Sequence, residues 1–156
     1  MSPRLRHALP LAALLLAAPA ARAADANVQP AARLPAYTQE CSGCHIAYPP
    51  KMLPAESWGR LMAGLPRHFG TDASLDAATV NEITGYLQAS AGTGSRVRTA
   101  PPEDRITRAA WFVREHDEIP AATWQRAAVR SPANCAACHP RAEQGDFDEH
   151  AVRIPR

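Results

Sequence analysis

The sequence predicts an all-α protein built from two small lobes. Its apolar residues recur at the three- and four-residue spacing of helices, and no stretch alternates apolar and polar residues as a half-buried strand does. Residues 90–104 are mostly small or polar and include two adjacent prolines, which indicates a connector outside a core. We therefore expect an N-terminal lobe over residues 24–97, and a linker with a C-terminal lobe over residues 98–156.

The first 23 residues have the three parts of a secretory signal peptide. Arg4 and Arg6 form a basic start, residues 9–18 are apolar, and Ala-Arg-Ala at 21–23 precedes the expected cleavage site. The apolar stretch is shorter than the about 20 residues that a membrane-spanning helix needs. We therefore expect residues 1–23 to be removed on export and the mature protein to be soluble.

The charge balance excludes a nucleic-acid-binding surface. Removal of the signal peptide takes away three arginines and no acidic residue, so 17 basic residues against 15 acidic ones become 14 against 15. Basic residues are interleaved with acidic ones, and Lys51 is the only lysine of the chain. No basic stripe of the kind that follows a phosphate backbone is present in the sequence.

Two helices are predicted in the N-terminal lobe. The first ends at Pro66, and the apolar residues on its stripe are Trp58, Leu61, Met62 and Leu65. The second follows Asp76, a residue typical of helix N-caps. Its apolar stripe is formed by Val80, Ile83 and Leu87.

A longer and a shorter helix are predicted in the C-terminal lobe. The longer one ends before Pro120, and the residues expected on one of its faces are Ile106, Ala109, Ala110, Val113 and His116. The shorter one carries Trp124 and Ala128. The three tryptophans are expected to pack in the core, because large aromatic side chains contribute much of the apolar area that small domains bury. They are Trp58, Trp111 and Trp124.

All four cysteines of the chain belong to two copies of one motif, Cys-x-x-Cys-His. The first copy is Cys41-Ser42-Gly43-Cys44-His45, and the second is Cys135-Ala136-Ala137-Cys138-His139. This motif is typical of c-type haem attachment, in which the two thiols bind the porphyrin covalently and the histidine binds the iron. A redox-active dithiol, a four-cysteine zinc site and a disulfide framework also use paired cysteines, but none of them requires the histidines.

The motifs therefore predict two covalently bound haem c groups. Their attachment residues are Cys41, Cys44, Cys135 and Cys138, and their proximal iron ligands are His45 and His139. Covalent haem attachment in bacteria takes place outside the cytoplasmic membrane, which agrees with the signal peptide and predicts a periplasmic protein. Each lobe is near the lower size limit for an adequate core, so a haem would supply apolar volume that the side chains lack.

The second axial ligand of each haem has several candidates. His68 lies 23 residues after His45, in a segment where a loop could fold over the haem. His116 lies 23 residues before His139, on the predicted apolar helix face. We take these two as the distal ligands. The alternatives left open are His150 for the second haem and a methionine, Met52 or Met62.

The sequence resembles the small periplasmic dihaem cytochromes c, over most of the mature chain. The segments that carry the resemblance are Trp58-Gly59-Arg60-Leu61-Met62 before His68, Asn134 and the second motif, Ala142, Gly145-Asp146-Phe147, and Ile154-Pro155. The resemblance implies a cytochrome c-like N-terminal lobe, a distinct C-terminal lobe, and bis-histidine ligation with His68 and His116 as distal ligands. It also implies redox partners such as an oxygen-binding monohaem cytochrome c and a membrane cytochrome b. His150 matches no position of that pattern.

The prediction that follows is an electron-transfer protein without catalytic residues, in which each iron changes oxidation state and remains six-coordinate. Bis-histidine ligation predicts reduction potentials below those of histidine–methionine cytochromes. One alternative is a haem enzyme or gas-binding sensor, which requires a vacant distal position on one iron. A second alternative is an electron-entry subunit of a larger oxidoreductase.

Overall fold

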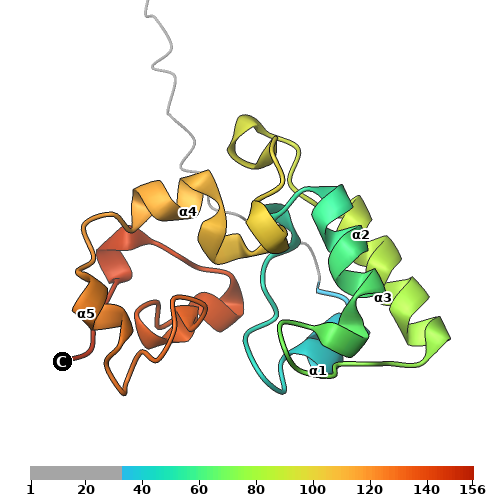
Figure 1. Cartoon of the computed structure of the whole chain (residues 1–156), viewed down its shortest axis with the longest axis horizontal. Coiled ribbons are helices and arrows are strands. Elements are labelled where there is room, and N and C mark those ends of the chain that lie inside the picture. The colour runs from blue at the N-terminus through green and yellow to red at the C-terminus, as the bar shows by residue number, and fades with distance from the viewer. Residues whose placement is uncertain (1–32) are drawn as a thin grey trace, which may run out of the picture.

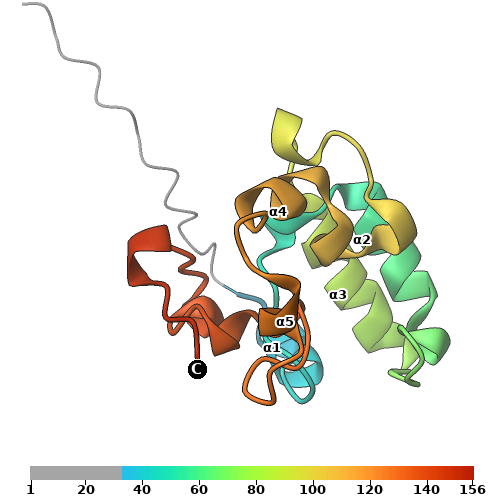
Figure 2. The ribbon, with the colours of Figure 1, turned by 60° about the vertical axis from the view of Figure 1, so that its left-hand side comes forward.

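The structure is a computed structural model that describes residues 33–156, so the expected signal peptide lies outside the described part of the chain. Five α-helices follow one another along these residues: α1 Pro35–Cys41, α2 Ala55–Ala63, α3 Ala77–Ala89, α4 Ala110–Glu115 and α5 Ala121–Trp124. In Figure 1, α1 to α3 occupy one end of the molecule, and α5 lies with the C-terminal turns at the other. In Figure 2 the C-terminal turns lie on the opposite side of the molecule from α2 and α3.

Short 3-10 turns connect and extend these helices. They are η1 Pro50–Met52, η2 Leu65–Arg67, η3 Ser95–Val97, η4 Pro102–Asp104, η5 Ile106–Arg108, η6 Cys135–Ala137, η7 Ala142–Gln144 and η8 Glu149–Ala151. Within residues 33–156 the only strand-like pairing is an isolated bridge between His68 and Thr71. The predicted all-α fold is therefore confirmed. No helix among the described residues combines the length and the apolar character needed to cross a membrane.

Helices α2 and α3 form the centre of the first core cluster. Asp76 caps α3, because its carboxylate accepts hydrogen bonds from the backbone N–H groups of Ala78 and Thr79, each at 3.0 Å. Ile83 and Leu87 on the predicted stripe of α3 are fully buried. The buried members of the cluster are Tyr37, Ala47, Leu53, Trp58, Met62, Leu65, Ile83 and Leu87.

A second core cluster forms around the start of α4. Its buried members are Val97, Ala109, Trp111 and Phe112, with Met52, Ile106 and Trp124 partly buried against them. Val97 lies within residues 90–104, so the expectation that this stretch lies outside a core is wrong there. The apolar side chain of Val97, which lies in η3, is buried in the second core cluster. The predicted boundary between residues 97 and 98 remains a prediction.

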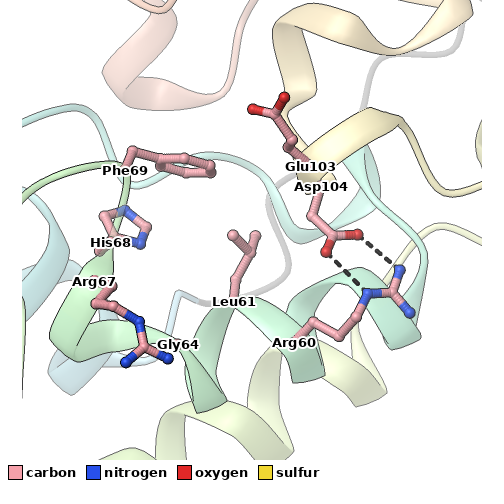
Figure 3. Close-up of a pocket in the computed structure, with 8 residues that line it drawn as sticks. All are labelled: Arg60, Leu61, Gly64, Arg67, His68, Phe69, Glu103 and Asp104. Carbon is pink, nitrogen blue, oxygen red and sulfur yellow. Dashed lines mark hydrogen bonds and ion pairs between the residues drawn. The ribbon is translucent and has the colours of Figure 1, made fainter.

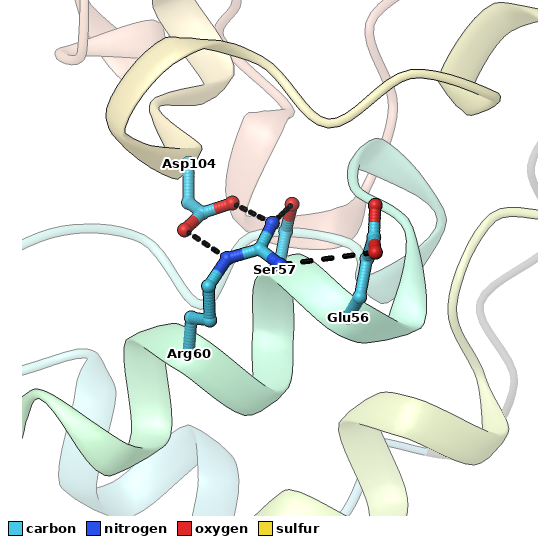
Figure 4. Close-up of polar contacts among 4 residues, drawn as sticks. All are labelled: Glu56, Ser57, Arg60 and Asp104. Carbon is cyan, nitrogen blue, oxygen red and sulfur yellow. Dashed lines mark hydrogen bonds and ion pairs between the residues drawn. The ribbon is translucent and has the colours of Figure 1, made fainter.

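The same stretch is also attached to the first core cluster by polar contacts. The backbone N–H of Gly92 donates to the carbonyl oxygen of Leu53 at 3.0 Å. The Arg60 guanidinium on α2 donates to both carboxylate oxygens of Asp104, from Nε at 2.9 Å and from a terminal nitrogen at 2.7 Å (Figure 4). This is the bidentate geometry in which the planar guanidinium of arginine binds both oxygens of a carboxylate. Asp104 thus ties η4 to α2.

The predicted continuous helix face from Ile106 to His116 is wrong. Ala109 has extended backbone angles (φ −64°, ψ 138°) and separates η5 from α4. This break changes the phase of the helix, so Trp111 and Phe112 enter the core while Val113 is 56% exposed. His116 is the residue directly after α4 and has left the helical conformation (φ −128°, ψ 14°).

The other helix ends differ from the predictions by smaller amounts. α2 ends at Ala63, and Leu65 belongs to the following turn η2 instead of the helix. α5 ends at Trp124, so Ala128 lies outside it. Trp58 and Trp111 are buried as expected, and Trp124 is partly buried.

Replacing Gly92 by alanine is expected to destabilise the protein. A Cβ atom at this position would lie 2.5 Å from the Lys51 carbonyl oxygen and 2.5 Å from a methyl carbon of Val97. We expect Gly92→Ala to lower the free energy of unfolding by about 1 to 3 kcal/mol, as overpacked sites do. Denaturant unfolding of the haem-loaded protein measures the change. The matched control is Gly94→Ala, since a Cβ there meets nothing within 4 Å; an equal loss in both variants would contradict the prediction.

The Arg60 to Asp104 contact is expected to make stability fall in acid. The hydrogen bonds from Arg60 lower the pKa of the Asp104 carboxyl below its usual value, so the unfolded chain takes up a proton there before the folded protein does. The stabilisation is complete above the unfolded-state pKa of about 3.9 and is lost as the pH falls through the lower folded-state pKa.

We therefore expect Asp104→Asn to reduce the thermal midpoint at pH 7 and to flatten its decrease below about pH 4. Thermal unfolding of wild type and variant between pH 2.5 and pH 7 measures both effects. Parallel curves for the two proteins would show that this carboxyl does not contribute to the acid dependence.

Candidate functional site

The first Cys-x-x-Cys-His motif begins on the last residue of α1 and continues through a tight turn. Cys41 is partly buried at the end of the helix, and Cys44 is exposed. The His45 Nδ1 atom lies 2.7 Å from the carbonyl oxygen of Ile46. Because a carbonyl oxygen only accepts, Nδ1 carries the hydrogen in this contact, which leaves the lone pair of Nε2 free to bind a metal.

His68 is placed beside His45 by a sharp reversal of the chain after η2. Its backbone N–H donates to the Leu65 carbonyl oxygen at 3.2 Å, and Leu65 is buried in the first core cluster. The next two residues, Phe69 and Gly70, have positive φ angles of 50° and 97°. The ring centroids of His45 and His68 are 6.1 Å apart. Burial is the main cause that lowers the pKa of His68, and the nearby His45 lowers it further. The lowered pKa favours the neutral form of the ring, which can bind a metal.

The second motif is paired with His116 in a similar way. The His116 ring stacks on Phe112 with centroids 4.0 Å apart, and its Nδ1 lies 2.8 Å from the Phe112 carbonyl oxygen. His139 follows η6, and its backbone N–H donates to the Cys135 carbonyl oxygen at 2.8 Å. The ring centroids of His116 and His139 are 6.2 Å apart. Burial and the neighbouring His116 lower the pKa of His139.

Both ring separations fit two imidazoles on one iron. A first-row metal binds an imidazole nitrogen at about 2.0 to 2.1 Å, and that nitrogen lies roughly 1.1 Å from the ring centroid, so the centroids lie about 6.3 Å apart. The measured separations are 6.1 and 6.2 Å. The side-chain Nδ1 of His139 is buried and has no hydrogen-bond partner among the described residues. Each pair thus combines a motif histidine with a histidine from a distant segment.

The four thiols suit covalent attachment better than dithiol redox chemistry. All four cysteines are free of disulfide bonds. Burial raises the pKa of the Cys41 thiol and of the Cys135 thiol to about 11 in each case, whereas a reactive dithiol needs a lowered pKa. No three histidine, cysteine or acidic side chains of residues 33–156 converge into a metal-binding group.

The remaining candidate ligands lie in other surroundings. The His150 side chain is 86% exposed in η8, where its Nε2 is 4.0 Å from a carboxylate oxygen of Glu149. Met62 is buried in the first core cluster, and Met52 packs against the second. The structure therefore brings His68 and His116, and not His150, next to the motif histidines.

A cavity opens on the outer side of His68 (Figure 3). Its lining consists of Arg60, Leu61, Gly64, Arg67, His68, Phe69, Glu103 and Asp104. The Phe69 ring is covered on one side by the Arg105 guanidinium, whose carbon atom lies 4.1 Å from the ring centroid. Such an arrangement is a cation–π contact. The arginines around this cavity are balanced by acidic residues, since Arg60 pairs with Asp104 and Arg105 pairs with Glu103.

A second cavity separates the two motifs. The first motif and the residues after it contribute Cys44, His45, Ile46 and Tyr48, and the other side is formed by Ser131, Ala133, Asn134 and Cys135. The Tyr48 ring stacks on His45 with centroids 4.8 Å apart, and its hydroxyl donates to the Ala133 carbonyl oxygen at 2.7 Å. Tyr48 is not among the site residues predicted from the sequence. An aromatic residue three positions after a motif histidine is a signal that could have identified it.

The comparisons with known proteins agree with this geometry. A family model described as dihaem cytochrome c matches residues 37–147. The diheme cytochrome c from Shewanella baltica OS155 is 41% identical, with a TM-score of 0.69, over 78% of this chain and 92% of that one. Two solved structures of the diheme cytochrome c from Rhodobacter sphaeroides are 48% and 46% identical, with TM-scores of 0.64 and 0.66.

The Rhodobacter sphaeroides matches cover 73% and 74% of this chain, and 96% and 98% of the relatives. No curated protein matches the chain. The solved relatives therefore correspond to this chain over nearly their whole length. Together with the two Cys-x-x-Cys-His motifs, these matches show that the chain belongs to the dihaem cytochrome c family and carries two covalently bound haem c groups.

Proposed function

We propose that this protein is a periplasmic electron carrier whose two haems are each held in six-coordinate form by two histidines. The proposed ligand pairs are His45 with His68, and His116 with His139. Membership of the dihaem cytochrome c family supports a role in haem-based electron transfer. The observation that carries the ligand assignment is the separation of each pair of rings, 6.1 and 6.2 Å.

The surrounding residues favour ligation through one nitrogen of each ring. A haem iron supplies one-electron chemistry between its ferric and ferrous states when it is bound. The carbonyl oxygens of Ile46 and Phe112 accept from Nδ1 of His45 and His116, which fixes the tautomer and the orientation of both rings. Stacking on Phe112 further restrains His116. Rings held in this way keep other ligands and water from the metal, as an electron carrier requires.

Export to the periplasm is supported by the signal-peptide pattern of residues 1–23 and by the haem-attachment motifs. The expected partners are redox proteins. The resemblance described above favours an oxygen-binding monohaem cytochrome c as electron acceptor and a membrane cytochrome b as donor. Purification as a monomer supports this carrier, whereas a stable complex with a larger enzyme supports the alternative of an electron-entry subunit.

Carbon monoxide tests whether both irons are six-coordinate. We expect the visible spectrum of the reduced protein to remain unchanged under carbon monoxide, because each iron already has two imidazoles. His68→Ala and His116→Ala are each expected to create one carbon monoxide-binding haem per protein, while His150→Ala binds none. Visible titration with carbon monoxide measures the stoichiometry. Binding to the unaltered protein would favour the haem enzyme or gas sensor, and binding only in His150→Ala would exclude His116 as ligand.

Exchange of the distal ligand tests the assignment independently. We expect His68→Met to raise the reduction potential of one haem by on the order of 100 mV, since axial ligands set haem potentials over a range of about 0.8 V. A spectroscopic redox titration resolves the two haems. Met62→Leu is the matched control, because Met62 lies in the core cluster and should leave both potentials in place. Equal potentials in His68→Met and wild type would contradict ligation by His68.

A further inference from the structure

Tyr48 connects the segment that follows the first motif with the segment that precedes the second. Its ring lies on the His45 imidazole, at 4.8 Å between centroids and 22° between planes. Its hydroxyl donates to the carbonyl oxygen of Ala133, two residues before Cys135, at 2.7 Å. Of the hydrogen bonds within residues 33–156, this one spans the largest separation in sequence, 85 residues.

The backbone around Tyr48 is fixed by buried contacts. The Tyr37 hydroxyl, from α1, donates to the Tyr48 carbonyl oxygen at 2.8 Å. The Trp58 indole N–H, from α2, donates to the Pro50 carbonyl oxygen at 2.7 Å. Ala47 is buried in the first core cluster. The Tyr48 ring therefore starts from a rigid base and does not need to be ordered by its contact with Ala133.

The receiving segment is exposed, and hydrogen bonds within residues 129–134 restrain it. The backbone N–H of Ala133 donates to the Ser131 hydroxyl at 3.1 Å, and that of Asn134 donates to the Ser131 carbonyl oxygen at 3.0 Å. The Asn134 side-chain amide donates to the carbonyl oxygen of Val129 at 3.0 Å, and Val129 is fully buried. A hydrogen bond between two rigid segments restrains their relative position more than one between flexible loops, because little ordering entropy opposes it.

We propose that Tyr48 is a positioning residue that fixes the proximal imidazole of the first haem relative to the attachment segment of the second. This inference rests on the two-haem electron-transfer function proposed above. Electron exchange between two cofactors depends on their separation and mutual orientation, which the protein sets by holding the residues that bind them. The Tyr48 ring contacts one such residue, His45, and its hydroxyl binds Ala133 in the segment just before the second motif.

Two substitutions at Tyr48 separate these contacts. Tyr48→Phe keeps the ring on His45 and removes the donor to Ala133, whereas Tyr48→Leu removes both. Tyr86→Phe is the matched control, because it also removes one tyrosine hydroxyl, from a ring that packs against the first core cluster at a tilt of 44° to Tyr37. All variants are prepared with both haems. Pulsed dipolar electron paramagnetic resonance of the fully oxidised protein gives the distribution of iron-to-iron distances, and flash-induced partial reduction gives the rate of electron exchange between the haems.

We expect Tyr48→Phe to broaden the distance distribution and to raise roughly fivefold the fraction of molecules in which residue 48 and Ala133 are apart, the size expected for the loss of one neutral hydrogen bond. Tyr48→Leu should broaden it further and also change the g values of one haem, since the imidazole loses its stacking partner. Electron exchange should slow in the same order. Tyr86→Phe should match wild type in all three measurements.

An unchanged distance distribution and exchange rate in Tyr48→Phe would overturn the positioning role, as would equal changes in Tyr86→Phe. Failure of the underlying function has a different signature. If either iron had a vacant distal position, the spectrum of the oxidised wild type would contain a high-spin ferric signal, and carbon monoxide would bind without any substitution. If Tyr48→Phe lost thermal stability while its iron-to-iron distances stayed unchanged, Tyr48 would only stabilise the fold. That result would also overturn the proposal.

Discussion

The spacing between two imidazole rings is the constraint on which the rest of this structure depends. Under the proposed ligation, each iron needs two histidines at a centroid separation of about 6.3 Å, and the chain would provide that separation twice, between residues 23 positions apart. The described structure holds His45 and His68 at 6.1 Å, and His116 and His139 at 6.2 Å. Backbone carbonyl oxygens orient one ring of each pair, so the geometry is prepared by local chain conformation.

The short helices and frequent 3-10 turns follow from this demand. A long helix keeps its side chains on fixed faces, whereas a turn can direct one side chain to a chosen point. His68 and His139 each come directly or shortly after a 3-10 turn, and His116 directly follows α4. Small core clusters anchor these turns through residues such as Leu65 and Phe112.

Specific polar contacts join the two halves of the described chain. Arg60 in the first half binds Asp104 in the second through two hydrogen bonds, whereas Gly92 allows close approach to Lys51 within the first half. Tyr48 adds a contact beside the motifs themselves. Residues 90–104 thus pack against both core clusters, although their composition resembles that of a free connector. Composition reports the propensity to form turns, and burial depends on neighbours that are distant in sequence.

The sequence by itself determined the cofactor, because covalent attachment needs a fixed local spacing of cysteines and histidine that is visible in five residues. It also determined the helical class and the cap of α3 at Asp76, which depend on periodicity and on contacts within one turn. Only the tertiary structure decided which distant histidine approaches each motif, that Val113 faces solvent, and that Tyr48 meets Ala133. Each of these depends on helix phase and on contacts across many residues, which local patterns do not encode.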